Sequence, residues 1–336
     1  MTLVPSHRAR LLATAPKAVV AIIAAAALMA ACTSCSSRAV ASRRPSSTVA
    51  QSDGGSARAV TPPSTNAALA AGTVSGGAVL EQVDIPSTDG FKPRPAYLYL
   101  PPAAVRNPDL RLPVLELLHG TPDQPADWID HGELIPTINS FAAAHGGEAP
   151  IVVMPDLNGT YRADSECIRT ADGKDTESYL TGDVVTWIRA HFPRSVGQEK
   201  WWLAGMSEGG LCSLFLTLRH PQVYSAIGDF SGFAAPIVDG LSQAASDRQL
   251  YRGNSQDKLE HEPLWLLAHG HYAGLPAWFE CGTDDHPTVI QQQAMVVAAA
   301  RAAGLRVHVS TAPGTHNWSV WSVALRSLLP WLWSQR

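Results

Sequence analysis

Residues 205–209 form the pattern Gly-x-Ser-x-Gly, with Ser207 at its centre. One apolar run precedes the pattern and another follows it, which favours a strand that turns sharply into a helix. In such a turn the serine hydroxyl lies at the helix N-terminus, where backbone N–H groups favour developing negative charge. Gly205 and Gly209 let the strand and the helix approach closely, where larger side chains would clash. The pattern therefore predicts that Ser207 is a nucleophile.

A serine hydroxyl is a weak nucleophile until a base removes its proton. When the serine lies on this kind of turn, the acid and then the histidine follow it along the chain. His316 is the candidate base, because it follows the last predicted strand and precedes the last predicted helix. The other histidines that lie in loops after Ser207 are His261, His269, His271 and His286.

Two candidate acids, Asp284 and Asp285, directly follow the predicted strand 277–281. Functional side chains of a parallel sheet gather at the carboxyl ends of its strands, where both aspartates lie. The acid would hold one tautomer of His316 and stabilise the imidazolium that forms. The aspartate that is not used would serve as a turn or helix cap. The residues alone leave both choices open.

Acyl transfer also needs N–H donors for the oxygen of the tetrahedral intermediate. The first candidate is the backbone N–H of Glu208, the residue after the nucleophile. The second is the N–H of Thr121, which follows the predicted strand 114–118, because Pro122 has no N–H to offer. His119 lies at the end of the same strand, and we expect it to support the architecture rather than to act as a base.

The elements that would position these residues alternate between strand-like and helix-like runs, as in an α/β sheet. The first two strands are expected to pair as an antiparallel hairpin, and the continuous apolar runs to be parallel strands covered on both faces. Strands are predicted at 78–85, 96–100, 114–118, 151–154, 201–204, 225–230, 277–281 and 305–310. Helices are predicted at 176–192, 211–218, 288–303 and 317–333, and a helical lid within 233–271.

Several short motifs resemble one known family. They are LLHG at 117–120, IVVMPD at 151–156, TESYLT at 176–181, GMSEGG at 205–210, GTDD at 282–285 and GTHNW at 314–318. With these motifs, residues 85–333 resemble the esterase branch of the α/β-hydrolases. That branch includes S-formylglutathione hydrolases of the esterase D type, enterochelin esterases, feruloyl esterase domains and the antigen 85 mycolyltransferases.

The resemblance implies an α/β-hydrolase fold, with a mostly parallel central sheet flanked by helices and an N-terminal antiparallel hairpin. It favours Asp285 over Asp284 as the acid, and it implies a carboxylic-ester hydrolase that needs no metal and no cofactor. The substrate would be a small-molecule, lipid or glycolipid ester. The alternatives are a cell-envelope acyltransferase acting on a sugar hydroxyl and a binding protein on a hydrolase fold.

Two positions depart from the family. Glu208 stands where Met or Ala is common, and its carboxyl is expected to disfavour anionic substrates. The antigen 85 proteins carry Asp-Gly where this chain has His119-Gly120, and their acid is a glutamate. Mycolate transfer is therefore not implied.

The N-terminus has the pattern of an export signal. Arg8, Arg10 and Lys17 accompany an uncharged apolar run at 18–31, which is shorter than the ~20 residues of a membrane span and ends at Cys32. Residues 1–31 are therefore predicted to be a signal peptide, either of the lipoprotein type with Cys32 lipidated or of the secretory type, or else an uncleaved anchor. Membrane attachment would then occur through the N-terminus. The Ser-, Ala- and Pro-rich residues 32–76 are predicted to be a disordered tether, and 77–336 the catalytic domain.

Charge and cysteine content narrow the function further. Residues 71–336 hold 18 of the 25 Lys and Arg and 28 of the 29 Asp and Glu, which argues against a nucleic-acid partner. Export permits disulfides, and Cys167 is expected to pair with Cys212, the alternative being two buried thiols. His269 and His271 have no neighbouring Cys or carboxylate to complete a metal site. Trp128 and Trp318 lie beside the catalytic loops and are candidate substrate contacts.

Overall fold

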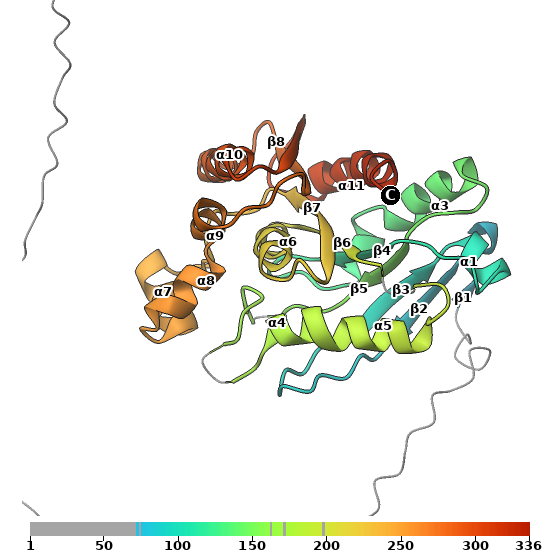
Figure 1. The fold of residues 1–336 in the computed structure, drawn as a ribbon, viewed down its shortest axis with the longest axis horizontal. Coiled ribbons are helices and arrows are strands. Elements are labelled where there is room, and N and C mark those ends of the chain that lie inside the picture. The colour runs from blue at the N-terminus through green and yellow to red at the C-terminus, as the bar shows by residue number, and fades with distance from the viewer. Residues whose placement is uncertain (1–71, 74, 162, 171–172, 197–198) are drawn as a thin grey trace, which may run out of the picture. The chain divides into compact units, whose positions relative to one another are not determined.

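A nine-stranded sheet organises the domain, in the order β1-β2-β3-β5-β4-β6-β7-β8-β9. The computed structural model describes residues 72–73, 75–161, 163–170, 173–196 and 199–336 (Figure 1). The strands are β1 (Gly72–Thr73), β2 (Val79–Val83), β3 (Ala96–Leu100), β4 (Val114–Leu118), β5 (Ile151–Met154), β6 (Trp201–Met206), β7 (Tyr224–Phe230), β8 (Pro276–Gly282) and β9 (Arg306–Ala312). The short strand β1 lies within the range that the sequence assigns to the tether.

In the order of the sheet, β5, β4, β6, β7, β8 and β9 each pair in parallel with the next strand. The strands β1, β2, β3 and β5 each pair antiparallel with the next one. Every residue of β4, β5 and β6 is buried, which explains why their sequences are mostly apolar rather than alternating, with Glu116 of β4 as the one charged residue. The expected α/β-hydrolase sheet is confirmed, and so is the hairpin of β2 and β3.

The helices of the described residues are α1 (Pro102–Arg106), α2 (Asp127–Asp130), α3 (Leu134–Ala144), α4 (Thr176–Ser178), α5 (Val185–His191), α6 (Glu208–Arg219), α7 (Gln243–Tyr251), α8 (Ser255–His261), α9 (Pro263–His269), α10 (Pro287–Ala302) and α11 (Trp318–Trp333). A π-helical turn at Tyr179–Val184 joins α4 to α5, so the two form the one continuous helix that the sequence predicts. None of the described helices is both long and apolar enough to cross a membrane.

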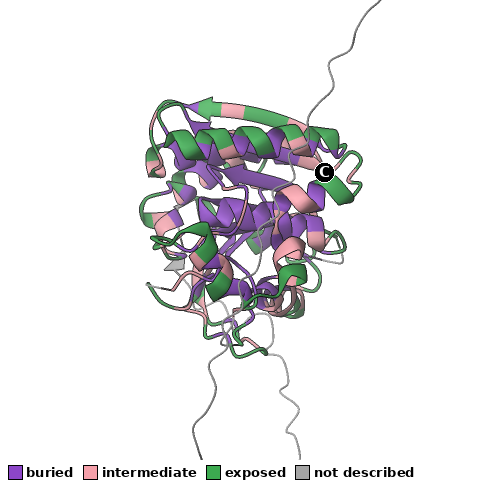
Figure 2. Ribbon diagram, turned by 90° about the vertical axis from the view of Figure 1, so that its left-hand side faces the viewer, coloured by how far each residue is buried: buried purple, intermediate pink, exposed green. Residues whose placement is uncertain are grey.

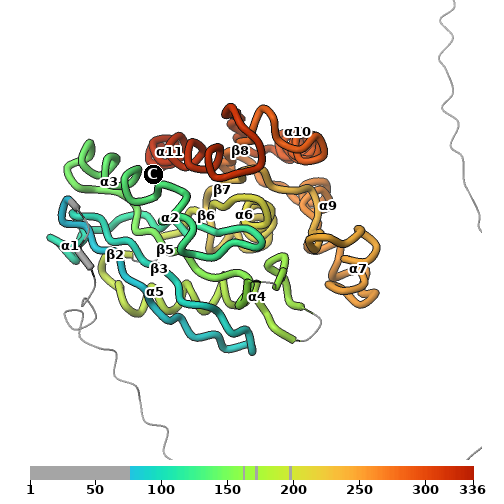
Figure 3. Tube along the Cα trace, turned by 180° about the vertical axis from the view of Figure 1, so that it is seen from behind, coloured from blue at the N-terminus to red at the C-terminus, as the bar shows by residue number. Residues whose placement is uncertain are grey.

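Helices cover both faces of the sheet. Figure 1 shows α3 and α11 on one side and α5 and α6 on the other, and Figure 3 shows the same arrangement from behind. In Figure 2 the inner strands are buried between helices whose outward sides are exposed. The small helices α7, α8 and α9 follow one another at one end of the domain, with α9 packed on α6. Residues 233–271 are therefore partly helical.

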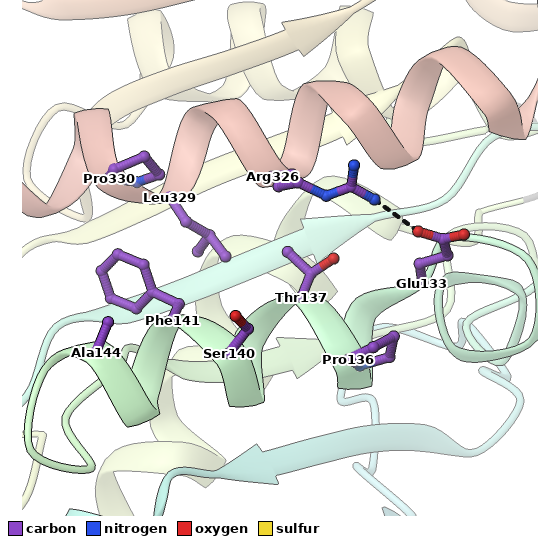
Figure 4. A pocket seen from close by; sticks show the side chains of 9 residues that line it. All are labelled: Glu133, Pro136, Thr137, Ser140, Phe141, Ala144, Arg326, Leu329 and Pro330. Carbon is purple, nitrogen blue, oxygen red and sulfur yellow. Dashed lines mark hydrogen bonds and ion pairs between the residues drawn. The ribbon is translucent and has the colours of Figure 1, made fainter.

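The contact between α3 and α11 includes a groove of about 340 Å³ (Figure 4). Phe141 and Ala144 of α3 face Leu329 and Pro330 of α11 across this groove. Near its other end, Arg326 of α11 forms an ion pair of 2.7 Å with Glu133. Because the loop that carries His316 leads directly into α11, the packing of α11 on α3 also fixes where that loop ends.

The sheet register brings the candidate loops together. Leu118 pairs with Gly205, Gly205 with Asp229, Phe230 with Glu280 and Gly282 with Ala312. The carboxyl ends of β4, β6, β8 and β9 therefore meet at one edge of the sheet, as parallel pairing requires. The loops that leave this edge carry Thr121, Ser207, Asp285 and His316. The predicted signal peptide, Cys32 and nearly all of the predicted tether lie outside the described residues.

Candidate active site

Ser207 lies at the sharp turn between β6 and α6. Its backbone has φ 55° and ψ −119°, a left-handed conformation that is strained for any residue but glycine. The turn is held by the Ser207 N–H, which donates to the Phe230 carbonyl over 2.8 Å. A Cβ on Gly205 would lie 2.4 Å from the carbonyl oxygen of Gly209, and one on Gly209 would lie 2.3 Å from that of His119. The two glycines are therefore required by close backbone contacts.

His316 lies within hydrogen-bond distance of the serine. Its Nε2 is 2.9 Å from Ser207 Oγ, although 109 residues separate the two along the chain. On the other side of the ring, Nδ1 lies 3.1 and 3.2 Å from the two carboxylate oxygens of Asp285. The side chain of His316 is partly exposed, so a substrate can reach the ring edge between Nε2 and the serine. An arrangement of this kind, with a base beside the hydroxyl and an acid behind the base, can activate a serine.

Asp285, not Asp284, is the carboxyl that contacts His316. The carboxyl of Asp285 is buried, and its Oδ1 also accepts from the His286 N–H at 2.7 Å. Burial alone would raise the pKa of Asp285, but the hydrogen bond and the charge of His316 outweigh it and lower that pKa below its usual value. Asp284 is exposed and accepts from its neighbour Thr283 at 3.0 Å, as expected for a turn residue.

The two candidate oxyanion donors flank the serine. Glu208 is the first residue of α6, and Thr121 follows β4, whose end pairs with the end of β6. Within the described residues neither backbone N–H donates to a protein acceptor. Donors of this kind remain available to a substrate oxygen.

The carboxyl of Glu208 points away from solvent into a buried polar network. Its Oε2 contacts the Thr121 hydroxyl and accepts from Asn158 Nδ2 at 2.9 Å, and its Oε1 accepts from the Glu166 N–H at 3.1 Å. Burial and the charge of Asp164 raise the pKa of Glu208 to about 8. The raised pKa favours the protonated form of Glu208 at neutral pH, and its side chain connects two loops to α6.

Cys167 and Cys212 form a disulfide between the loop that follows β5 and helix α6. Cys167 and its neighbour Glu166 both have left-handed backbones, with φ of 53° and 49°. Such conformations cost about 1 kcal/mol or more for residues other than glycine and persist where the surroundings enforce them. In the described residues the one cluster of metal-ligating side chains consists of these two cysteines and Glu208, and both sulfurs are taken up by the disulfide.

Two other histidines have structural partners. His119 is fully buried, and its Nε2 accepts from the Leu157 N–H at 3.1 Å and lies 3.3 Å from Asp156. Its Nδ1 is 2.7 Å from the Gly120 carbonyl. His220 contacts Glu177 Oε1 at 2.6 Å, at the far end of α6. Their contacts are those of architectural residues, as the sequence suggests for His119.

A cavity of about 370 Å³ opens beside the serine. Phe233 and Trp321 form its aromatic wall, and the ring of Trp321 lies edge-on to His316 with 5.1 Å between centroids. Neither Trp128 nor Trp318 is among the described residues that line it. Trp128 is fully buried and donates to the Leu118 carbonyl, while Trp318 packs edge-on against it at 5.0 Å. The two tryptophans support the catalytic loops from behind.

The sequence did not single out Asn158, Asp164, Glu166, Phe233 or Trp321. The first three lie in the long loop after β5, which has no apolar periodicity. The cysteine at 167 is the one sequence signal that brings this loop to α6. Trp321 lies five residues after His316, on the face of α11 that packs toward the site.

Comparison with known proteins identifies a family and relatives of this chain. The family model Esterase, described as "Putative esterase", matches residues 91–332. An uncharacterized protein of Corynebacterium glutamicum is 32% identical over 251 residues, which are 73% of this chain and 58% of that protein. The chain thus spans about 58% of the length of this curated relative.

Solved structures share the fold. An S-formylglutathione hydrolase from Agrobacterium tumefaciens matches with a TM-score of 0.64 and 16% identity, over 78% of this chain and 97% of that one. A ferulic acid esterase matches with a TM-score of 0.61 and 22% identity, over 76% of this chain and 96% of that one. At such identities the match concerns the fold.

Proposed function

This chain belongs to the esterase family, and on that premise we propose that it is a serine ester hydrolase that works through an acyl-enzyme on Ser207. The observation that carries the proposal is the distance of 2.9 Å between Ser207 Oγ and His316 Nε2, with Asp285 bound to the opposite ring nitrogen. His316 is the general base and Asp285 orients it. The backbone N–H groups of Thr121 and Glu208 are the oxyanion donors.

In the acylation step, Ser207 Oγ attacks the ester carbonyl carbon while its proton moves to His316 Nε2. The carbonyl oxygen becomes an oxyanion and accepts hydrogen bonds from the two backbone N–H groups. The carbon–oxygen bond to the alcohol then breaks, and the proton on His316 leaves with the alcohol. The acyl group stays on Ser207 as an ester.

In the deacylation step, water takes the place of the alcohol. His316 removes a proton from the water, whose oxygen attacks the acyl carbon and forms a second oxyanion. The bond between that carbon and Ser207 Oγ breaks, Oγ recovers the proton, and a carboxylic acid leaves. The electron pairs and protons balance without a metal or cofactor.

The experiment is release of p-nitrophenol from acetate, butyrate and palmitate esters by the purified chain. Wild type should turn over at least one ester, and Ser207→Ala should lose that turnover. Ser140→Ala, an exposed serine of α3, is the matched control and should behave as wild type. Failure of a fluorophosphonate to label Ser207 in the folded chain would rule the proposal out.

An added sugar acceptor separates hydrolysis from acyl transfer. A hydroxyl that enters in place of water would take the acyl group from the same acyl-enzyme by the same steps. We propose water as the acceptor. Diversion of most of the acyl group to a sugar at millimolar concentration would instead assign the chain to the acyltransferases.

We also propose that the protein is exported, with Cys32 as its lipidated N-terminus. The basic residues, the apolar run at 18–31 and the small residues before Cys32 support this, and a disulfide fits an oxidising compartment. Mass spectrometry of the mature N-terminus tests it. A diacylglyceryl group on Cys32, lost in Cys32→Ser, is the expected result, and an unmodified N-terminus elsewhere would contradict it.

A further inference from the structure

Five of the fourteen described residues that line the cavity beside Ser207 carry a carboxyl group. None of the described residues that line this cavity is Lys or Arg, and its one basic side chain is His316. The arginines Arg248 and Arg252 line a neighbouring cavity instead. The acidic residues of the wall are Asp123, Asp164, Glu166, Glu208 and Asp239.

Asp164 and Glu166 form a close carboxyl pair at this wall. Their side chains share a hydrogen bond, for which one of the two must carry a proton. Apart from that bond, Oε2 of Glu166 and Oδ1 of Asp164 are buried without a hydrogen-bond partner among the described residues, while Oδ2 of Asp164 accepts from the Asp239 N–H at 2.7 Å. Burial and the neighbouring carboxyl of Asp164 raise the pKa of Glu166 well above its usual value. A positive group in the cavity would favour loss of the shared proton and would then face a carboxylate.

The shape of the wall favours an organic cation over a metal ion. A metal needs ligand atoms that converge, and in the described residues only the set of Glu208 with the two disulfide-bonded cysteines does so. The rest of the wall is aromatic and aliphatic, with Phe233 and Trp321 near Ile237 and Leu241. Aromatic faces beside carboxylates are the surroundings that substituted ammonium groups prefer.

We propose, on the premise of the proposed esterase function, that this cavity selects esters that carry an organic ammonium group within a few bonds of the reacting carbonyl. The cation lies against Asp164 and Glu166 and the aromatic wall while the carbonyl carbon lies at Ser207 Oγ. Esters with a carboxylate at the same distance are poor substrates, because the wall repels them.

The test compares isosteric esters on the full chain. The first pair is acetylcholine, with its trimethylammonium group in the alcohol, and the uncharged isostere 3,3-dimethylbutyl acetate. The second pair is the p-nitrophenyl ester of 4-(trimethylammonio)butyrate, with the cation in the acyl group, and that of the uncharged isostere 5,5-dimethylhexanoate. In at least one pair, kcat/KM should be about tenfold or more higher for the cation, since one charge pair at this spacing is worth about that factor.

Substitutions of Glu166 and Asp239 test whether the preference for cationic esters depends on the carboxyl groups of the cavity wall. Glu166→Gln keeps the shape of the protonated acid but cannot ionise when a cation enters, and Asp239→Asn is exposed, so both should fold. Each should lower the ratio of the two kcat/KM values, and Asp239→Lys should lower it further. Glu199→Gln, an exposed carboxyl paired with Arg111, is the control and should keep the wild-type ratio.

The outcomes separate this inference from the proposed function. Turnover of the neutral esters with a ratio near one or below in both pairs overturns the cation site and leaves the esterase standing. A wild-type ratio in both Glu166→Gln and Asp239→Lys also overturns it. Absence of turnover together with an unreactive Ser207 removes the esterase itself and, with it, the site.

Discussion

The backbone N–H of Glu166 donates to the side chain of Glu208 over 3.1 Å, which joins the loop after β5 to the residue that follows the nucleophile. The disulfide between Cys167 and Cys212 lies one residue from this bond on the loop and four residues from it on α6. The acidic wall of the cavity is thereby held to the same helix that presents Ser207. Its position relative to the serine depends on these two links.

Loss of the disulfide should loosen that wall. The double change Cys167→Ala and Cys212→Ala opens a loop of 45 residues and should lower the free energy of unfolding by about 4 kcal/mol on the chain-entropy estimate. KM should rise more than kcat falls, because Ser207 and His316 are placed by the carboxyl ends of β6 and β9 and not by this loop. Urea unfolding and steady-state kinetics measure the two effects. Dithiothreitol should lower the free energy of unfolding of wild type but leave that of the double variant unchanged. An equal decrease in both proteins would contradict the assigned disulfide.

The assignment of the acid predicts a large asymmetry between neighbours. Asp285→Asn should lower kcat by roughly 10³- to 10⁴-fold, because an amide favours the wrong tautomer of His316. Asp284→Asn changes an exposed turn and should keep kcat near that of wild type. Steady-state kinetics on one p-nitrophenyl ester settles the comparison. Equal losses in the two variants would show that the loop, and not the carboxyl of Asp285, is what matters.

Glu208 should set an alkaline limit on activity. Its pKa is raised to about 8 by burial and by Asp164, so its carboxyl is neutral at pH 7 and gains a negative charge above that value. A charge there opposes the oxyanion next to it, so kcat/KM should fall above about pH 8. Glu208→Gln cannot ionise and should move this alkaline limb to higher pH. An identical limb in variant and wild type would assign the decline to another group.

Glu177 should make stability depend on pH in the acid range. Its carboxyl binds Arg219, His220 and His261 at 2.7, 2.6 and 2.8 Å. Burial alone would raise the pKa of Glu177, but these partners outweigh it and hold that pKa well below its usual range. A lowered folded pKa means that the stabilisation is complete above the unfolded value of about 4.3 and is lost as pH falls below it.

The substitution Glu177→Gln removes this negative charge. Glu177→Gln should cost about 3 kcal/mol at pH 7, because it leaves Arg219 without its buried partner. Its free energy of unfolding should then change less than that of wild type between pH 5 and pH 2. Denaturant unfolding at several pH values measures both slopes, with the exposed Glu199→Gln as control. Parallel slopes would exclude Glu177 as the acid-sensitive group.

The strand pattern and the triad loops could be predicted because they depend on local signals. The bounds of β3, β4 and β5 match the predicted runs, since apolar residues bounded by prolines or glycines read as buried strands. β6 continues two residues further than expected, through Gly205 and Met206, because its neighbours β4 and β7 extend the pairing. Once the strands are placed, the loops after β6, β8 and β9 must meet.

The helix α3 and the acidic wall could not be predicted, for different reasons. The residue before α3 is Glu133, which has a left-handed backbone and no side-chain cap, so the usual start signal is missing. Asp164 and Glu166 lie in a long loop, and the disulfide that fixes this loop joins two cysteines 45 residues apart in sequence. The position of Trp128 beside the catalytic loops in sequence predicts a place at the cavity. The structure buries it instead, because its indole N–H donates to the buried Leu118 carbonyl.

The strand order also determines which of Ser207 and His316 loses its position first when the domain begins to unfold. β9 lies at the edge of the sheet, pairs with β8 alone among the described strands and is largely exposed (Figure 2). Edges fray at lower free energy than centres, and the loop that holds His316 begins at the end of β9. Mild denaturant should therefore abolish turnover while far-ultraviolet circular dichroism still reports a folded sheet, and a coincident loss of both would show that the edge is as stable as the centre. Ser207 directly follows an inner strand, β6, whereas His316 follows the outermost strand, β9, so the enzyme should lose the placement of His316 before that of Ser207.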